Sequence, residues 1–282
     1  MFLTLATHPS DLLSFWHAIT LGIIQGITEF LPVSSTGHMI LINHLFQPNT
    51  NNASWEQSLN TYMVCIQLGT IVALILFFRH EIIQMIQGLL GKNKAGLCLG
   101  INLCIAFIPA GACGFFCGDW IQSHLYGKSN LIYSILAGAF LIFYLHYYTQ
   151  KTPHKYDQLD QITTRMAIGI GLWQIVALWP GFSRSLATIA GGIFVGLSLT
   201  KAIQFSFLLG LLTSSVACGY KGLKHGAEML QTLDMTSITA GIIVAAIVGL
   251  SSIQFLLLCL KRYGLKPFGY YRCVLALLLM IF

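Results

Sequence analysis

Charged residues are scarce in this sequence. Asp, Glu, Lys and Arg make up only 9% of its 282 residues, and 56% are hydrophobic, whereas soluble domains carry about 25% charged residues. No charge occurs at 95–118, 129–150, 202–220 or 235–260, nor at 57–78. Each run is long enough for the ~20-residue helix that crosses a ~30 Å hydrocarbon core. The composition therefore excludes a soluble domain and indicates an integral membrane protein.

The sequence also lacks a Cys-x-x-Cys pair. We interpret its cysteines as small buried hydrophobic residues, rather than as disulfides or metal ligands, because they lie almost wholly in apolar runs. They are Cys65, Cys98, Cys104, Cys113, Cys117, Cys218, Cys259 and Cys273.

Two further apolar regions, at about 15–45 and 166–199, are interrupted. Pro32 and the Ser-Ser-Thr-Gly that follows split the first, and Pro180-Gly181 splits the second. Proline and glycine break helical hydrogen bonding, and broken backbone at membrane depth is tolerated only where it is buried in protein or lines a wet cavity. We therefore expect two re-entrant helix-loop-helix segments.

The order of these segments predicts an internal repeat. Each interrupted region precedes three apolar runs, so the repeats cover approximately 12–150 and 160–282 of a single membrane domain, 1–282. Three spans between the re-entrant segments would place them on opposite sides of the membrane, so the repeats are inverted. The expected fold is an all-α polytopic membrane protein with about six transmembrane helices, the last at 266–282 and interrupted by Arg272.

The net charge of +6 is better explained by membrane topology than by an acidic partner, and no nucleic acid partner is expected. With the N-terminus outside, ten of the fifteen Lys and Arg fall inside and three fall outside: Lys128, Lys221 and Lys224. The positive-inside bias therefore places both termini outside.

The first interruption concentrates polar groups. Glu29 and His38 are ionisable residues within apolar sequence, which is costly and therefore indicates function. Gln25 stands four residues before Glu29, so the two share one helix face. Ser34, Ser35, Thr36 and Gly37 follow as a polar turn, and His38 lies at or near the start of the next half-helix, where backbone N–H groups favour an anion.

The second interruption carries matching groups. Gly181 allows close backbone approach, Arg184 supplies a planar fork suited to phosphate, and Ser183, Ser185 and Thr188 supply hydroxyls. Two helix N-termini meeting near the membrane centre with these groups predict a phosphate site. The alternative is that hydroxyls in membrane helices bond their own backbone or a neighbouring helix, and for Arg272 we favour such a structural role.

A carboxylate beside a phosphate requires an explanation, because like charges repel. A divalent cation between Glu29 and the phosphate oxygens resolves this conflict, and Mg²⁺ or Ca²⁺ takes such oxygen ligands.

Both motifs resemble those of the undecaprenyl-pyrophosphate phosphatase family, of the bacitracin-resistance type. QGITEFLPVSSTGH, from Gln25 to His38, matches the first family motif at every position, and PGFSRSLAT, from Pro180 to Thr188, departs from the second only at Leu186, where the family usually has Gly. Gln204 is another departure, because relatives commonly carry Glu there. The resemblance continues at 66–78, 108–110, 196–210 and 270–272.

The resemblance implies an inner-membrane enzyme that hydrolyses undecaprenyl pyrophosphate to undecaprenyl phosphate for cell-wall glycan synthesis. Its active site would open to the extracytoplasmic side, among membrane lipids, and the family fold is often a homodimer. Glu29 and Gln25 would serve the metal, and Arg184 would hold the pyrophosphate. Ser35 is the family's proposed nucleophile, while His38 is proposed either as nucleophile or as acid/base.

Several alternatives stay open at the level of sequence. We favour a phosphoryl-enzyme at Ser35 with His38 as its base, over phosphohistidine at His38 or direct attack by water. The other lipid-phosphatase pattern fails, since Ala190 stands where its histidine is required. Inverted repeats with broken helices are also typical of transporters, so a polyprenyl-phosphate flippase is the alternative function.

Overall fold

The protein is helical throughout the part that the structure describes. The computed structural model describes residues 15–46, 53–232 and 234–281, and no strand occurs within these ranges. The helices are α1 (Phe15–Thr28), α2 (Ser35–Phe46), α3 (Ala53–Phe77), α4 (Arg79–Leu89), α5 (Lys94–Leu125), α6 (Lys128–Lys151), the 3-10 helix η2 (Leu159–Gln161), α7 (Thr164–Val176), α8 (Arg184–Phe194), α9 (Leu199–Thr232), α10 (Met235–Tyr263) and α11 (Lys266–Ile281). The expected all-α class is confirmed.

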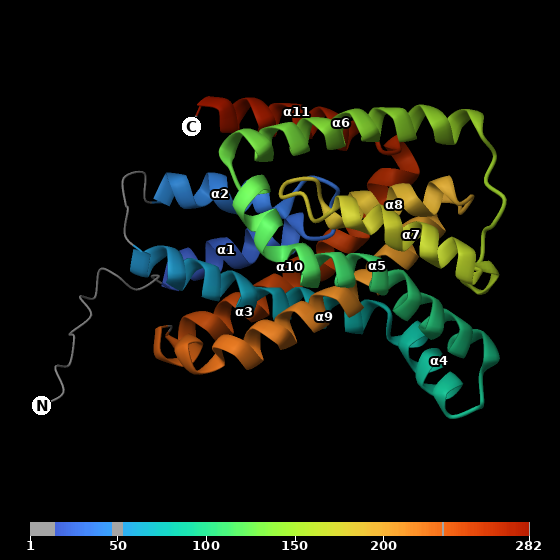
Figure 1. Ribbon diagram of the computed structural model, residues 1–282, viewed down its shortest axis with the longest axis horizontal. Coiled ribbons are helices and arrows are strands. Elements are labelled where there is room, and N and C mark those ends of the chain that lie inside the picture. Colours follow the sequence, from blue (N-terminus) through green and yellow to red (C-terminus); the bar gives the residue numbers. More distant parts are fainter. Residues whose placement is uncertain (1–14, 47–52, 233, 282) are drawn as a thin grey trace, which may run out of the picture.

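The long helices run side by side along the longest dimension of the molecule (Figure 1). Four of those described, α5, α6, α9 and α10, are long and apolar enough to cross a membrane, and the pair α3–α4, bent by 77°, makes a fifth if it is one span. At 16 residues, α11 is shorter than these spans. A polytopic membrane protein is therefore confirmed, while six spans and two re-entrant segments stay predictions.

Both interrupted regions form a helix, a break and a second helix. In Figure 1, α1 and α2 extend from their break to the left, whereas α7 and α8 extend from theirs to the right, and the two breaks meet near the centre. Each break ends at a serine with positive φ, Ser34 at 73° and Ser183 at 81°. This backbone is uncommon for residues other than glycine and gathers at functional sites.

Each of these serines caps the helix that follows it. Ser34 Oγ accepts a hydrogen bond from Gly37 N at 3.1 Å, and Ser183 Oγ accepts one from Leu186 N at 3.4 Å. Ser35 and Arg184 are consequently the first residues of α2 and α8. A hydroxyl and a guanidinium thus occupy corresponding positions of the two breaks.

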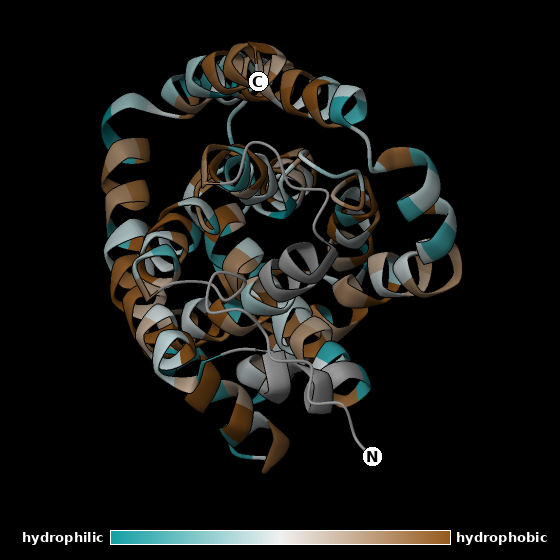
Figure 2. Ribbon diagram, turned by 90° about the vertical axis from the view of Figure 1, so that its left-hand side faces the viewer, coloured by the Kyte–Doolittle hydropathy of each residue, from teal (hydrophilic) through white to brown (hydrophobic). Residues whose placement is uncertain are grey.

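Apolar side chains cover the outside of the bundle as well as its interior. Figure 2 shows hydrophobic segments all around the molecule, and large apolar residues such as Phe116 and Phe140 are 81% and 72% exposed. Lipid is the solvent that accepts such a surface. Inside, α8 is buried along nearly its whole length and packs on α7 and α9.

One prediction about the cysteines is wrong. All eight are free, as expected, but Cys98, Cys104 and Cys117 are exposed and only Cys218 is buried. The reason is that apolar sequence in a membrane protein also faces outward, so a position in an apolar run does not imply burial.

Several helix ends on the right of Figure 1 carry basic residues. These ends carry Lys94, Lys151, Lys201, Arg262 and Lys266, whereas α6 begins on the left at Lys128. The orientation of the protein in the membrane stays a prediction.

Candidate active site

An ion pair joins the two breaks. Arg184 Nη2 donates to Glu29 Oε1 at 2.7 Å, and the side chains are only 17% and 10% exposed. It is the only Lys/Arg–carboxylate pair found among the described residues. Glu29 follows the end of α1 and Arg184 begins α8, so residues 155 positions apart in the chain converge because the two helix pairs meet end to end.

The second oxygen of Glu29 faces the first break. Gln25 Nε2 donates to Glu29 Oε2 at 3.1 Å, and Ser35 Oγ donates to the same oxygen at 3.5 Å. Glu29 therefore connects the candidate nucleophile to the candidate phosphate-binding arginine. The sequence predicted that Gln25 and Glu29 share a helix face, and the structure places them in contact.

Both ring nitrogens of His38 are engaged. Nδ1 lies 2.7 Å from the carbonyl oxygen of Ser34, and Nε2 lies 2.6 Å from the hydroxyl of Tyr271. A carbonyl can only accept, so Nδ1 carries a proton and Nε2 of the neutral ring accepts from Tyr271. The two rings also stack, 5.5 Å apart and 11° from parallel.

This arrangement differs from the one expected for a Ser35–His38 pair. Within the part of the chain that the structure describes, the hydroxyl of Ser35 bonds Glu29, and His38 bonds Ser34 and Tyr271. Sequence reasoning did not assign Tyr271 a role. Its only signal was its position in the YYR stretch beside Arg272, because the contact joins residues 233 positions apart.

The hydroxyls of the second break are bonded within the protein. Ser183 Oγ and Ser185 Oγ lie 3.0 Å apart, and Ser185 Oγ lies 3.4 Å from the carbonyl oxygen of Leu31, to which it donates. Thr188 is fully buried, and its hydroxyl shares a 2.6 Å hydrogen bond with Ser206. Ser183, which is only partly buried, is the most exposed of these three.

The helix starts around the ion pair suit an anion. Ser35 and Thr36 occupy the first turn of α2, and Arg184 and Ser185 occupy that of α8, where backbone N–H groups have no partner within the helix. Such N–H groups and the helix dipole favour negative charge. Gly181, at φ 92°, lies so close to Ser134 and Leu131 that a side chain there would clash.

Arg272 donates hydrogen bonds to the backbone of both breaks. Its side chain is 0% exposed and donates to Pro32 O at 3.3 Å and to Gly181 O at 2.9 Å. It also donates to the carbonyls of Ser134 and Ile135 on α6. Sequence favoured a structural role for Arg272. In the structure that role is to connect the two breaks to α11 through hydrogen bonds of its guanidinium.

A glycine of α9 makes room for Arg184. A Cβ added at Gly210 would overlap the guanidinium of Arg184, whose Nη1 donates to Ser206 O at 3.4 Å. Gly210 was not among the predicted site residues, because its relation to Arg184 exists only once α8 packs on α9.

Two residues that depart from the family pattern, Leu186 and Gln204, have different neighbours in the structure. Leu186 is 0% exposed and packs within the apolar core. Gln204 accepts a hydrogen bond from Lys201 Nζ at 3.0 Å.

The residues present suit a divalent cation only in part. No cluster of three or more His, Cys, Asp or Glu occurs among the described residues, so the protein supplies one carboxylate, Glu29. Gln25 directs its amide N–H₂ at that carboxylate and is not oriented as a ligand. Mg²⁺ is commonly bound by one or two carboxylates together with substrate phosphates, and Glu29 with a pyrophosphate fits that pattern.

Comparisons with known proteins agree over nearly the whole chain. The family model described as "Bacitracin resistance protein BacA" matches residues 18–278. The protein named undecaprenyl-diphosphatase of Geobacillus sp. (strain WCH70) is 37% identical over 96% of this chain and 98% of its own length. The proteins of that name from Geobacillus kaustophilus and Sorangium cellulosum are 36% and 35% identical, over 95% and 94% of this chain and 97% and 86% of their own lengths.

Proposed function

This chain belongs to the bacitracin resistance protein BacA family, and we propose that it hydrolyses undecaprenyl pyrophosphate to undecaprenyl phosphate and inorganic phosphate. Relatives at 35–37% identity that align over most of their length carry the name undecaprenyl-diphosphatase. The observation that carries the proposal is the contact of Glu29 with both Arg184 and Ser35. It joins an anion-binding cation, a carboxylate and a hydroxyl at two helix starts.

The same geometry favours Ser35 as the nucleophile. Ser35 Oγ would attack the terminal phosphorus while its proton passes to Glu29, the carboxylate it already faces. The bond between that phosphorus and the bridging oxygen would break, so that undecaprenyl phosphate leaves. Water would then hydrolyse the phosphoserine and release inorganic phosphate.

Arg184 and the helix starts would offset the charge that develops on the phosphoryl oxygens, which is usually the largest contribution to catalysis of this kind. His38 as nucleophile is less favoured, since Nε2 would first have to give up its bond to Tyr271. The pyrophosphate must also compete with Glu29 for Arg184.

A bound Mg²⁺ or Ca²⁺, held by Glu29 and substrate oxygens, would neutralise part of the negative charge of the pyrophosphate. Holding a cation and accepting the Ser35 proton are then competing uses of one carboxylate.

The proposed site opens to the extracytoplasmic side of the inner membrane. The charge asymmetry of the helix ends supports this orientation, because α1 and α2 reach the end opposite to the Lys-rich and Arg-rich one (Figure 1). We also propose assembly as a homodimer, because the family that this chain resembles is often dimeric.

Phosphate release from undecaprenyl pyrophosphate by the purified protein tests the function. We expect wild type to be active and Ser35→Ala, His38→Ala and Arg184→Ala to be strongly impaired, Arg184→Ala by roughly 10²–10³-fold because a donor to the transition state is lost. If all four were equally inert while polyprenyl phosphate still crossed vesicle membranes, the flippase would be the correct function.

Tyr271→Phe should lower kcat/KM about tenfold, the effect of losing one hydrogen bond of about 1.4 kcal/mol that fixes His38. Steady-state phosphate release measures it. Tyr270→Phe is the control, because Tyr270 packs on Phe143 and is 57% exposed. Equal activity of the two variants would show that the Tyr271 hydroxyl does not position His38.

Gln25→Glu should lower the concentration of Mg²⁺ or Ca²⁺ needed for half-maximal activity about tenfold, since a second carboxylate would join Glu29 on the same helix face. The measurement is a metal titration of phosphate release after treatment with a chelator. An unchanged titration midpoint would mean that position 25 does not face the cation.

A further inference from the structure

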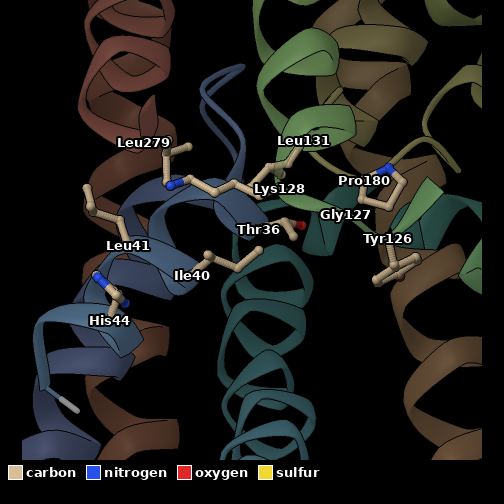
Figure 3. A pocket seen from close by; sticks show the side chains of 10 residues that line it. All are labelled: Thr36, Ile40, Leu41, His44, Tyr126, Gly127, Lys128, Leu131, Pro180 and Leu279. Carbon is tan, nitrogen blue, oxygen red and sulfur yellow. The ribbon is translucent and has the colours of Figure 1, made fainter. Parts of the chain in front are cut away.

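A pocket of about 300 Å³ opens beside the two breaks. Thr36 lines it from the first turn of α2 and Pro180 from the second break, and the rest of its wall comes from α2, α6, α11 and the turn before α6 (Figure 3). Thr36 is the immediate neighbour of Ser35. The pocket therefore adjoins the proposed reaction site without including Glu29 or Arg184.

Its wall is mostly apolar and carries a primary amine. Ile40, Leu41, Leu131 and Leu279 supply the apolar surface. Lys128, the first residue of α6, reaches across the pocket toward Leu279 in Figure 3. An apolar pocket of this size with few polar groups is typical of a small-molecule site, and the ammonium group selects an anionic amphiphile.

The order of groups in the substrate matches the order along the protein. In a polyprenyl pyrophosphate, the inner phosphate follows the terminal phosphate, and the first isoprene units follow the inner phosphate. If the terminal phosphate lies between Ser35 and Arg184, the inner phosphate and the isoprene units must lie successively farther from these two residues. Thr36, the neighbour of Ser35 in the chain, and Pro180, in the second break, both line the pocket. A bilayer phospholipid would match the amine and the apolar wall, but nothing in its chemistry would explain a pocket that ends beside Ser35.

We propose that Lys128 binds the inner phosphate of the substrate and that the pocket formed by Ile40, Leu41, Leu131 and Leu279 holds the first isoprene units. This inference rests on the proposed function. Its consequence is that the pocket selects for the prenyl chain, whereas Arg184 and the helix starts select for the terminal phosphate.

Lys128→Ala should raise KM about tenfold for undecaprenyl pyrophosphate and also for inorganic pyrophosphate, because both carry the second phosphate that Lys128 would bind. Lys128→Arg should restore most of the loss because it returns the charge. Lys224→Ala is the control, because Lys224 lies on α9 above Tyr220, outside the pocket.

Filling the pocket tests its apolar part separately. Ile40→Trp should raise KM for the long-chain substrate, whereas Leu45→Trp, also exposed on α2 but outside the pocket lining, should not. Wild-type KM values for Lys128→Ala and Ile40→Trp, or an equal loss on both substrates caused by Ile40→Trp, would overturn the proposal.

Binding of undecaprenyl phosphate, measured by equilibrium titration of the same variants, separates this inference from the proposed function. If wild type released no phosphate yet bound this lipid more tightly than Lys128→Ala, the enzyme proposal would fail and the pocket would stand. If Lys128→Ala instead lost co-purifying phosphatidylglycerol and bound undecaprenyl phosphate as wild type does, the pocket would be a phospholipid site and the inference would be wrong.

Discussion

Gly210→Ala is expected to lower phosphate release by roughly 10²–10³-fold, about as much as removing a donor to the transition state. The added methyl group would occupy the space of the Arg184 guanidinium, so Arg184 could no longer reach both Glu29 and Ser206 O. Alanine is also a better helix former than glycine, by about 1 kcal/mol, so the helix itself should not suffer. kcat/KM for undecaprenyl pyrophosphate is the measurement.

Gly219→Ala is the matched control for this variant. Gly219 lies on the same helix, α9, and a Cβ there would meet nothing within 4 Å. The control should therefore keep wild-type activity while gaining the same helix propensity. Activity of Gly210→Ala above half that of Gly219→Ala would show that the position of Arg184 is not critical.

Arg272→Met is expected to lower the free energy of unfolding by roughly 2–6 kcal/mol and to abolish activity. The carbonyls of Pro32 and Gly181 lie in the breaks, outside helices, so each would lose a buried hydrogen bond at about 1–3 kcal/mol. The carbonyls of Ser134 and Ile135 lie within α6 and keep their helical partners. Thermal unfolding in detergent, together with phosphate release, measures both effects.

The control for this variant is Arg262→Met at the end of α10. Arg262 is exposed and lies over the ring of Tyr263 at 5.2 Å, so its removal should change stability little. Arg272→Lys should be intermediate, because an ammonium group cannot span both breaks as the planar fork does. A wild-type melting temperature for Arg272→Met would contradict the role of Arg272 in joining the breaks.

Local patterns in the sequence were enough to predict much of the site. Pro32 and Pro180-Gly181 interrupt apolar runs and therefore mark the breaks, while ionisable residues in such runs are costly enough to indicate Glu29, His38 and Arg184. These inferences depend on residues close together in the chain. The second helix of each pair begins earlier than this pattern predicts, at Ser35 and at Arg184, because Ser34 and Ser183 cap these helices.

Contacts between distant segments lay beyond such reasoning. Tyr271 reaches His38 from α11. The absence of a side chain at Gly210 leaves space for the guanidinium of Arg184, and this matters only because α8 packs on α9. The sequence pattern favoured His38 as the base of Ser35, whereas the folded chain brings Ser35 to Glu29. The direction of a side chain at a helix break depends on the backbone conformation of the break. Arg272, on α11, stabilises that conformation through hydrogen bonds to both breaks.

The sequence by itself determined that this protein is a helical membrane protein with two broken segments that carry candidate phosphate-binding groups, because hydrophobicity and helix-breaking residues act locally. Only the tertiary structure decided which of these groups touch. The breaks meet because two helix pairs approach end to end, and that meeting pairs Glu29 with Arg184. The pocket at Lys128 likewise exists only where α2, α6 and α11 come together.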